Sequence, residues 1–111
     1  FKGEPKPTVA AVRNALDGRQ LILPPVVVTE ILSAPNGQLL EPIVLDMKVL
    51  RILHGYWLRA GQSRRLILRR GLKAKVADAL IAQSCIDHDV PLIAGDSDFR
   101  HFAKYCGLKL A

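Results

Sequence analysis

Four acidic residues in apolar surroundings are the part of this sequence best suited to chemistry. Glu30 lies in the stretch VVVTEIL, Asp78 lies in KVADALIAQ, and Asp96 and Asp98 closely follow VPLIA. A carboxylate near an apolar surface is costly unless it is paired or bound to a cation. Mg²⁺ and Mn²⁺ favour carboxylate and water ligands. If the four side chains converge, they form a metal site able to neutralise a phosphodiester and activate a bound water.

Each of these acids, taken alone, also has an ordinary structural explanation. Glu30 and Asp78 are typical of exposed helix residues or ion-pair partners. Asp96 lies in a Gly-Asp-Ser-Asp stretch typical of a turn, and Asp98 suits the N-cap of a helix that starts at Phe99. The order and setting of the four acids together favour a functional site.

The elements that must position these acids alternate along the chain. The β-branched run 26–29 by itself favours a strand, yet Pro25 suits the first turn of a helix, and we expect a helix there. Strands are expected at 21–23, 43–45, 90–94 and 108–110. Helices are expected at 9–16, 26–32, 75–88 and 99–105, and over 48–70 as one bent helix or two. This alternation predicts an α/β fold with a mostly parallel sheet.

Composition points to one domain in a reducing compartment. The 111 residues are 50% hydrophobic and 23% charged, which is a globular balance. No apolar run approaches the ~20 residues that span a bilayer, and the start lacks the pattern of a signal peptide. Cys85 and Cys106 have neither CxxC nor zinc-site spacing, so we expect two reduced, buried thiols in a cytoplasmic protein with no membrane association.

The net charge of +6 raises the odds of a polyanionic partner. Basic residues concentrate between positions 51 and 75. A solvated helix face is the usual explanation of such a run, and it is compatible with contact to a nucleic-acid backbone.

The motifs that carry the acids resemble those of a known family. ADALIA at 77–82, followed by PLIAGDSDF at 91–99, resembles the C-terminal signature of PIN domains. VVVTEIL resembles the helix that bears the family's glutamate, and GYWLRAGQSRRLILRRG is similar to the VapC-like toxin branch. The resemblance covers nearly the whole chain, with the motifs in the family's order.

The resemblance implies a three-layer α/β/α PIN-like fold with a mostly parallel sheet, in one domain over residues 1–111. It implies an endoribonuclease dependent on Mg²⁺ (or Mn²⁺), acting as the toxin of a toxin–antitoxin pair. By position, Glu30, Asp78 and Asp96 match the family's second, third and fourth acids, as catalytic and metal-binding residues. Asp98 is expected as a further or substitute metal ligand.

The resemblance also implies partners. RNA is the expected substrate, a cognate antitoxin the expected protein partner, and a homodimer the expected assembly. Trp57 with Tyr56 is a candidate dimer anchor, although both rings are also suited to the core. The residues expected to bind the RNA backbone are Arg64, Arg65, Arg69 and Arg70.

The start of the chain departs from the family pattern. PIN domains begin with a strand that ends in Asp, and nothing before Glu30 matches it, while FKGEPKP resembles the loop after the family's first helix. We therefore expect the first strand and first acid to lie outside this sequence. We expect the sheet to be completed either by another polypeptide piece or by pairing with a neighbouring molecule. Gly95 also stands where the family commonly has Thr.

Two alternatives remain open. A chain without the first acid could be a catalytically incomplete module that binds RNA or protein. An α/β phosphotransfer or phosphatase fold could use the Gly-Asp-Ser-Asp turn, although the nucleophilic Asp and the Lys that such folds need are not found.

Overall fold

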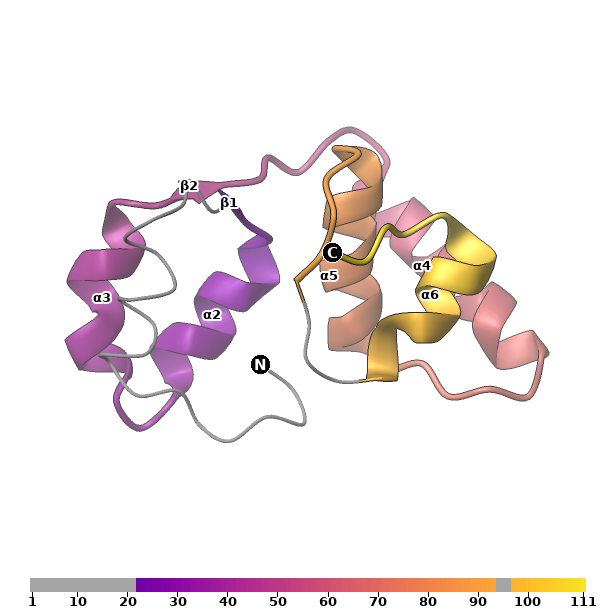
Figure 1. The fold of residues 1–111 in the computed structure, drawn as a ribbon, viewed down its shortest axis with the longest axis horizontal. Helices are drawn as coiled ribbons and strands as arrows, with labels where there is room; N and C mark the ends of the chain where they lie inside the picture. The colour runs from indigo at the N-terminus through magenta and orange to yellow at the C-terminus, as the bar shows by residue number, and fades with distance from the viewer. Residues whose placement is uncertain (1–21, 94–96) are drawn as a thin grey trace.

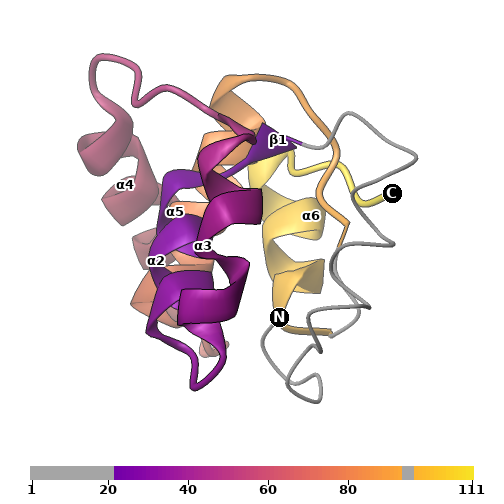
Figure 2. The same cartoon turned by 90° about the vertical axis from the view of Figure 1, so that its left-hand side faces the viewer.

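The computed structural model describes residues 22–93 and 97–111, and its helices form two groups. Helices α2 (Pro25–Ser33) and α3 (Gly37–Leu45) pack together on one side (Figure 1). Helices α4 (Tyr56–Arg69), α5 (Val76–Asp87) and α6 (Arg100–Cys106) form the other group, with a 3₁₀ turn, η1 (Ser97–Phe99), just before α6. Figure 2, in which α2 and α3 face the reader, shows α5 and α6 behind them. Helix α5 joins the groups, because it contacts α2, α4, α6 and η1.

Two short parallel pairings accompany the helices. Strand β1 (Ile22–Leu23) pairs with β2 (Lys48–Val49), and the Leu50 amide donates a 2.8 Å hydrogen bond to the Leu23 carbonyl. A separate parallel bridge joins Leu92 to Leu110. The α/β class and the parallel pairing predicted from the sequence are confirmed, although the strands expected at 90–94 and 108–110 contribute a single bridge within the described residues.

An apolar groove of about 410 Å³ lies between these two pairings. Its lining includes Ile22 and Leu23 from β1, Val27 from α2, and Leu92 and Ile93 from the other side. The groove therefore separates the β1–β2 pair from the Leu92–Leu110 bridge. The expectation that a first strand lies outside this sequence stays a prediction.

Three of the predicted helices are confirmed. Helix α2 begins at Pro25, as the proline at its first turn predicts. Helix α5 runs between caps at Lys75 and His88, and α6 ends at Gly107, whose φ of 82° is left-handed. The helix expected at 9–16 lies outside the described residues. In the part of the chain that is described, no helix has the length and apolarity to cross a bilayer.

The strand predicted at 43–45 is wrong, because this segment belongs to helix α3. The buried side chains of Leu40 and Val44 are four residues apart, which places them on one helix face against α2. Gly37 begins this helix beside the end of α2, where a β-carbon would collide with the Leu32 carbonyl oxygen. Packing against α2 therefore makes this segment helical, although its local propensity favours a strand.

The helix predicted over 48–70 is also wrong in its first third. Residues 48 and 49 form β2, and α4 begins only at Tyr56. Gly55 precedes α4 with a left-handed φ of 82°, a conformation that glycine adopts without a steric penalty. Pairing with β1 places residues 48 and 49 in the sheet.

Helix α5 is buried on nearly all sides rather than along one apolar face. Asp78, Ala79 and the run Ile81–Cys85 are buried, whereas Val76 in the first turn is 56% exposed. Burial raises the pKa of the Cys85 thiol to about 11, so the thiol stays protonated and unreactive at neutral pH. Both cysteines are free, and Cys85 is buried as predicted, whereas Cys106 is only half-buried.

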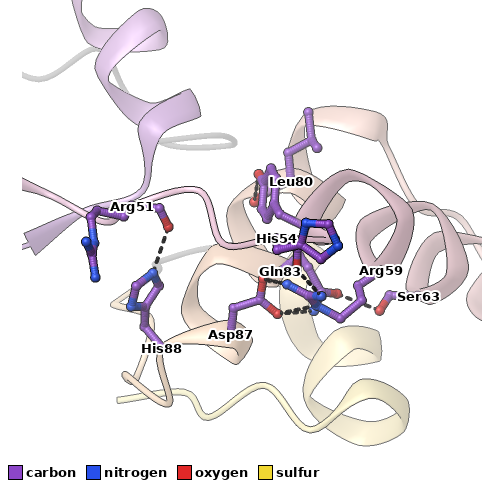
Figure 3. Close-up of polar contacts among 9 residues, drawn as sticks. Arg51, His54, Arg59, Ser63, Leu80, Gln83, Asp87 and His88 are labelled. Atoms are coloured by element: carbon purple, nitrogen blue, oxygen red, sulfur yellow. Dashed lines mark hydrogen bonds and ion pairs between the residues drawn. The ribbon is translucent and has the colours of Figure 1, made fainter.

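A polar network fastens the C-terminal half of α5 to α4 (Figure 3). The Arg59 guanidinium donates two hydrogen bonds to the Asp87 carboxylate, at 2.9 and 2.7 Å. Gln83 donates to the same carboxylate at 2.9 Å and accepts from the Ser63 hydroxyl at 2.7 Å. Arg59 also donates to the His54 carbonyl at 2.7 Å, which ties down the chain before α4. The Asp87 side chain is only 6% exposed, so these bonds replace its lost contact with water.

Replacing Asp87 with Asn should lower the thermal midpoint by roughly 4–8 °C near neutral pH, the shift expected on losing a charge-assisted hydrogen bond in a domain of this size. Arg59 holds the pKa of Asp87 below its ordinary value of 3.8. The ion pair therefore stabilises the fold above that pH, and its contribution is lost as the pH falls through the depressed pKa. The thermal midpoints of wild type and Asp87→Asn are measured from about pH 3 to about pH 7. The two midpoints should converge at the acid end of this range.

The matched control is Asp89→Asn. Asp89 pairs with Lys109 at 2.8 Å, but both side chains are well exposed, so its midpoint should move by less than about 2 °C. A difference between wild type and Asp87→Asn that stays constant with pH would refute the role given to the ion pair.

Candidate functional site

A pocket of about 490 Å³ forms where three segments meet. These are the loop from Gly71 to Lys75, the first turn of α5, and the region from Asp98 to the start of α6. The lining residues are Gly71, Leu72, Lys73, Lys75, Asp78, Asp98, Arg100 and His101. The pocket thus joins two of the acids that the sequence predicts for the site.

Asp78 lines the pocket from the first turn of α5 and is only 2% exposed. The start of a helix favours a carboxylate, because the backbone N–H groups of the first turn carry partial positive charge. The apolar neighbours of Asp78 in the sequence pack in the core and bury α5. Asp78 is buried because it belongs to the same helix. Buried carboxylates are retained where a partner or a cation stabilises them.

Asp98 lies in the η1 turn and is exposed. The alternative explanation of Asp98 as an N-cap does not hold, because Phe99 occupies the N-cap position of α6 and no side chain caps that helix end. Phe99 and Phe102 are almost fully buried, at 3% and 0% exposure. These two rings anchor η1 and α6 in the core and so fix Asp98 at the pocket.

The other two predicted acids are not placed in the pocket. Glu30 is half-buried on α2 and is not among the described residues that line the pocket. Asp96 lies outside the described residues. Over positions 22–93 and 97–111, no three His, Cys, Asp or Glu side chains gather closely enough to form a metal site. The structure therefore brings together Asp78 and Asp98 and leaves the remainder of the predicted set as a prediction.

The residues present in the pocket fit a hard divalent cation. Asp78 and Asp98 offer carboxylate oxygens from two separate segments. Mg²⁺ is commonly held by one or two carboxylates together with substrate phosphates and keeps several waters, so these two acids are donors of the kind that it takes.

A basic rim surrounds the two acids, formed by Lys73, Lys75, Arg100 and His101. The two lysines belong to the basic stretch noted in the sequence, but their position beside the acids could not be inferred from it. Arg100 and His101 were not singled out at all. Their position directly after the DSDF stretch was the available signal, since a turn that carries site acids also carries its neighbours toward the site.

The α4 arginines predicted to bind RNA have different surroundings. The Arg64 side chain donates a 2.8 Å hydrogen bond to the Ala74 carbonyl, within the loop that carries the two rim lysines. The Arg70 guanidinium lies 4.2 Å from the ring centre of Tyr105 on α6. Arg65 and Arg69 are exposed on α4. Two of the four arginines therefore also brace the walls of the pocket.

The two aromatic residues that begin α4 also differ. Tyr56 is 1% exposed, and its hydroxyl donates a 2.6 Å hydrogen bond to the Leu80 carbonyl on α5, so it belongs to the core. Trp57 packs edge-on against Tyr56 but is 62% exposed. Only Trp57 therefore remains available for contact with another molecule.

Comparison with known families gives one match. A family model described as a PIN domain matches residues 1–105, which is most of the chain and includes both acids of the pocket. No curated protein matches the chain.

Proposed function

Because the chain belongs to the PIN domain family, we propose that it is the toxin of a VapC-like toxin–antitoxin pair and cleaves RNA with Mg²⁺ or Mn²⁺. PIN domains are commonly nucleases and generally use divalent metal ions. The observation that carries the proposal is the pocket in which buried Asp78 and exposed Asp98 lie within a rim of cationic side chains.

In this proposal the acids hold the cation and the basic residues hold the RNA. Asp78 and Asp98 supply carboxylate oxygens from the pocket, and Glu30 and Asp96 complete the set. A bound divalent cation supplies charge neutralisation at a phosphodiester and lowers the pKa of a bound water. Burial of Asp78 keeps its carboxylate fixed, so little reorganisation accompanies binding of the cation.

The RNA backbone is proposed to run along α4 toward the pocket. Arg65 and Arg69 are exposed there and are able to contact phosphates directly. Arg64 and Arg70 add positive charge while bracing the loop and α6. Phosphate contacts of this kind would make RNA affinity fall steeply with salt.

Asp78→Asn should reduce the rate of RNA cleavage by at least about 100-fold, which corresponds to about 3 kcal/mol of transition-state stabilisation lost with a cation ligand. The assay is gel analysis of a labelled RNA with Mg²⁺ or Mn²⁺, and EDTA should abolish wild-type cleavage. The polypeptide should include any segment encoded upstream of Phe1.

The matched control is Asp46→Asn, an exposed acid at the end of α3. It should cleave at the wild-type rate, and both variants should melt cooperatively. If Asp78→Asn cleaves as fast as wild type, the site assignment fails. RNA binding without cleavage under any cation would instead favour the non-catalytic binding module.

Expression of the active protein in bacteria should arrest growth if it is a toxin, and Asp78→Asn should not. The readout is the growth curve after induction, with matched protein levels checked by immunoblot. Co-expression of the neighbouring antitoxin gene should restore growth. Equal arrest by wild type and Asp78→Asn would separate toxicity from nuclease activity and contradict the toxin mechanism.

A homodimer built on Trp57 is also part of the proposal. Trp57 and Leu58 are 62% and 68% exposed at the start of α4, an apolar pair typical of an interface centre. Trp57→Ala should shift the sedimentation coefficient from dimer to monomer. A wild-type protein that sediments as a monomer at high concentration would exclude the dimer.

A further inference from the structure

A tyrosine flanked by two cations lies where α4 and α6 meet. These two helices pack against each other (Figure 1). The Arg70 guanidinium is 4.2 Å from the centre of the Tyr105 ring, and the Lys104 ammonium is 5.2 Å from it. Arg70 and Lys104 are exposed, whereas Tyr105 is half-buried. The ring therefore supports two solvent-facing cations, and we call these three residues the Tyr105 surface.

The chemistry of this surface matches a ligand that carries both a negative charge and a flat ring. Like charges gathered at one place repel each other, and an anion bound beside them relieves this repulsion. Aromatic and guanidinium groups also offer a face on which a flat group can stack. Every unit of an RNA strand has this composition, because it joins a phosphate to a base.

The Tyr105 surface borders the acid-containing pocket without being part of its lining. Arg70 directly precedes Gly71, which lines the pocket. Tyr105 follows His101, another lining residue, by four positions, so the two side chains lie on the same face of α6. A strand that reaches the pocket along α4 therefore passes over this surface.

We propose that an unpaired base of single-stranded RNA stacks on Arg70 and Tyr105, and that Lys104 contacts a phosphate next to that base. The proposal rests on the proposed function, which supplies RNA as the ligand. It gives Arg70 a contact with a base, beyond the positive charge that it adds to α4, and it adds Tyr105 and Lys104 to the residues that bind RNA. Unpaired RNA bases stack on aromatic side chains and on Arg guanidinium planes, and here the two groups already lie one over the other.

The ordinary explanation of these contacts is that Arg70 braces α6 against α4. A bracing contact alone would affect every RNA ligand equally, whether or not the ligand carries bases. A contact made only with phosphates would likewise depend on charge and not on bases. Stacking differs from both, because its contribution disappears when the base is removed from the ligand.

The first test uses this difference. It compares a fluorescein-labelled ten-adenosine RNA with an abasic strand of the same length and charge, by fluorescence anisotropy in EDTA, where cleavage cannot interfere. Tyr105→Leu removes the ring and keeps an apolar side chain. It should weaken binding of the adenosine RNA at least about fivefold, as expected on losing one stacked base. It should change binding of the abasic strand less than about twofold.

Two further variants separate the ring and the guanidinium from their other properties. Arg70→Lys keeps the positive charge but removes the planar group, and it should reproduce the loss that is specific to the adenosine RNA. Tyr105→Phe keeps the ring and should bind both strands as wild type does. The matched control is Arg51→Lys, the same exchange at an exposed position before α4, and binding should change less than about twofold. Equal losses of both strands in Tyr105→Leu, or no loss of either, would overturn the proposal.

A second measurement uses the unaltered protein and so does not depend on the variants folding. Adenosine 5′-monophosphate should shift the Tyr105 ring-proton and Arg70 Nε–H resonances in NMR spectra. Ribose 5-phosphate has the same charged group but no base, and it should shift them far less. Equal shifts from the two ligands, or no shift from either, would overturn the stacking contact.

The outcomes for the stacking contact and for the nuclease are separable. RNA cleavage by a protein that fails both binding tests would refute only the stacking contact. Base-dependent binding at Tyr105 without cleavage under any cation would refute only the nuclease.

Discussion

The burial of helix α5 is the constraint on which the rest of this structure depends. Helices α2, α4 and α6 and the η1 turn all contact it, so every polar side chain that it carries needs a stabilising environment. At its C-terminal end, Asp87 and Gln83 are satisfied by the network that reaches Arg59 and Ser63. At its N-terminal end, Asp78 is equally buried but faces a pocket. One helix therefore carries a structural acid at one end and a candidate site acid at the other.

The basic residues of the chain perform different tasks although they share a charge. Arg59 is committed to Asp87, and Arg64 and Arg70 make contacts that brace the loop before α5 and the adjacent α6. Arg65 and Arg69 remain exposed on α4, while Lys73, Lys75 and Arg100 line the pocket. Of the basic side chains behind the net charge of +6, some thus stabilise the fold, and others are exposed or line the pocket. Long-range attraction of a polyanion depends on the whole charge, but local contact depends on the free side chains.

Acids and cations within one pocket suit phosphodiester chemistry. In the nuclease that we propose, the carboxylates would hold a divalent cation, and the nearby lysine and arginine side chains would compensate the charge of the phosphates. Neither group alone accounts for the lining of this pocket. Because the walls are braced by α4, the charges are held before a ligand arrives, which limits the reorganisation that binding requires.

The sequence by itself determined those helices whose start, end or apolar run is marked by nearby residues. It also placed Asp78 on one of these helices. Pro25 marked the start of α2, the apolar run around Asp78 marked α5, and Gly107 marked the end of α6. The sequence also indicated the family through the motifs around Asp78 and Asp98, and a PIN domain model matches residues 1–105.

Tertiary structure alone decided the segments and roles that depend on distant partners. Residues 43–45 have strand propensity, but packing of α3 against α2 makes them helical, and pairing with β1 draws residues 48 and 49 out of the predicted helix. The pocket joins loop 71–75 to the start of α6, about 25 residues further along the chain, and no local pattern encodes such a meeting. For the same reason, which arginines brace the fold and which cations face the acids could not be inferred from spacing, since it depends on contacts between helices rather than on sequence position.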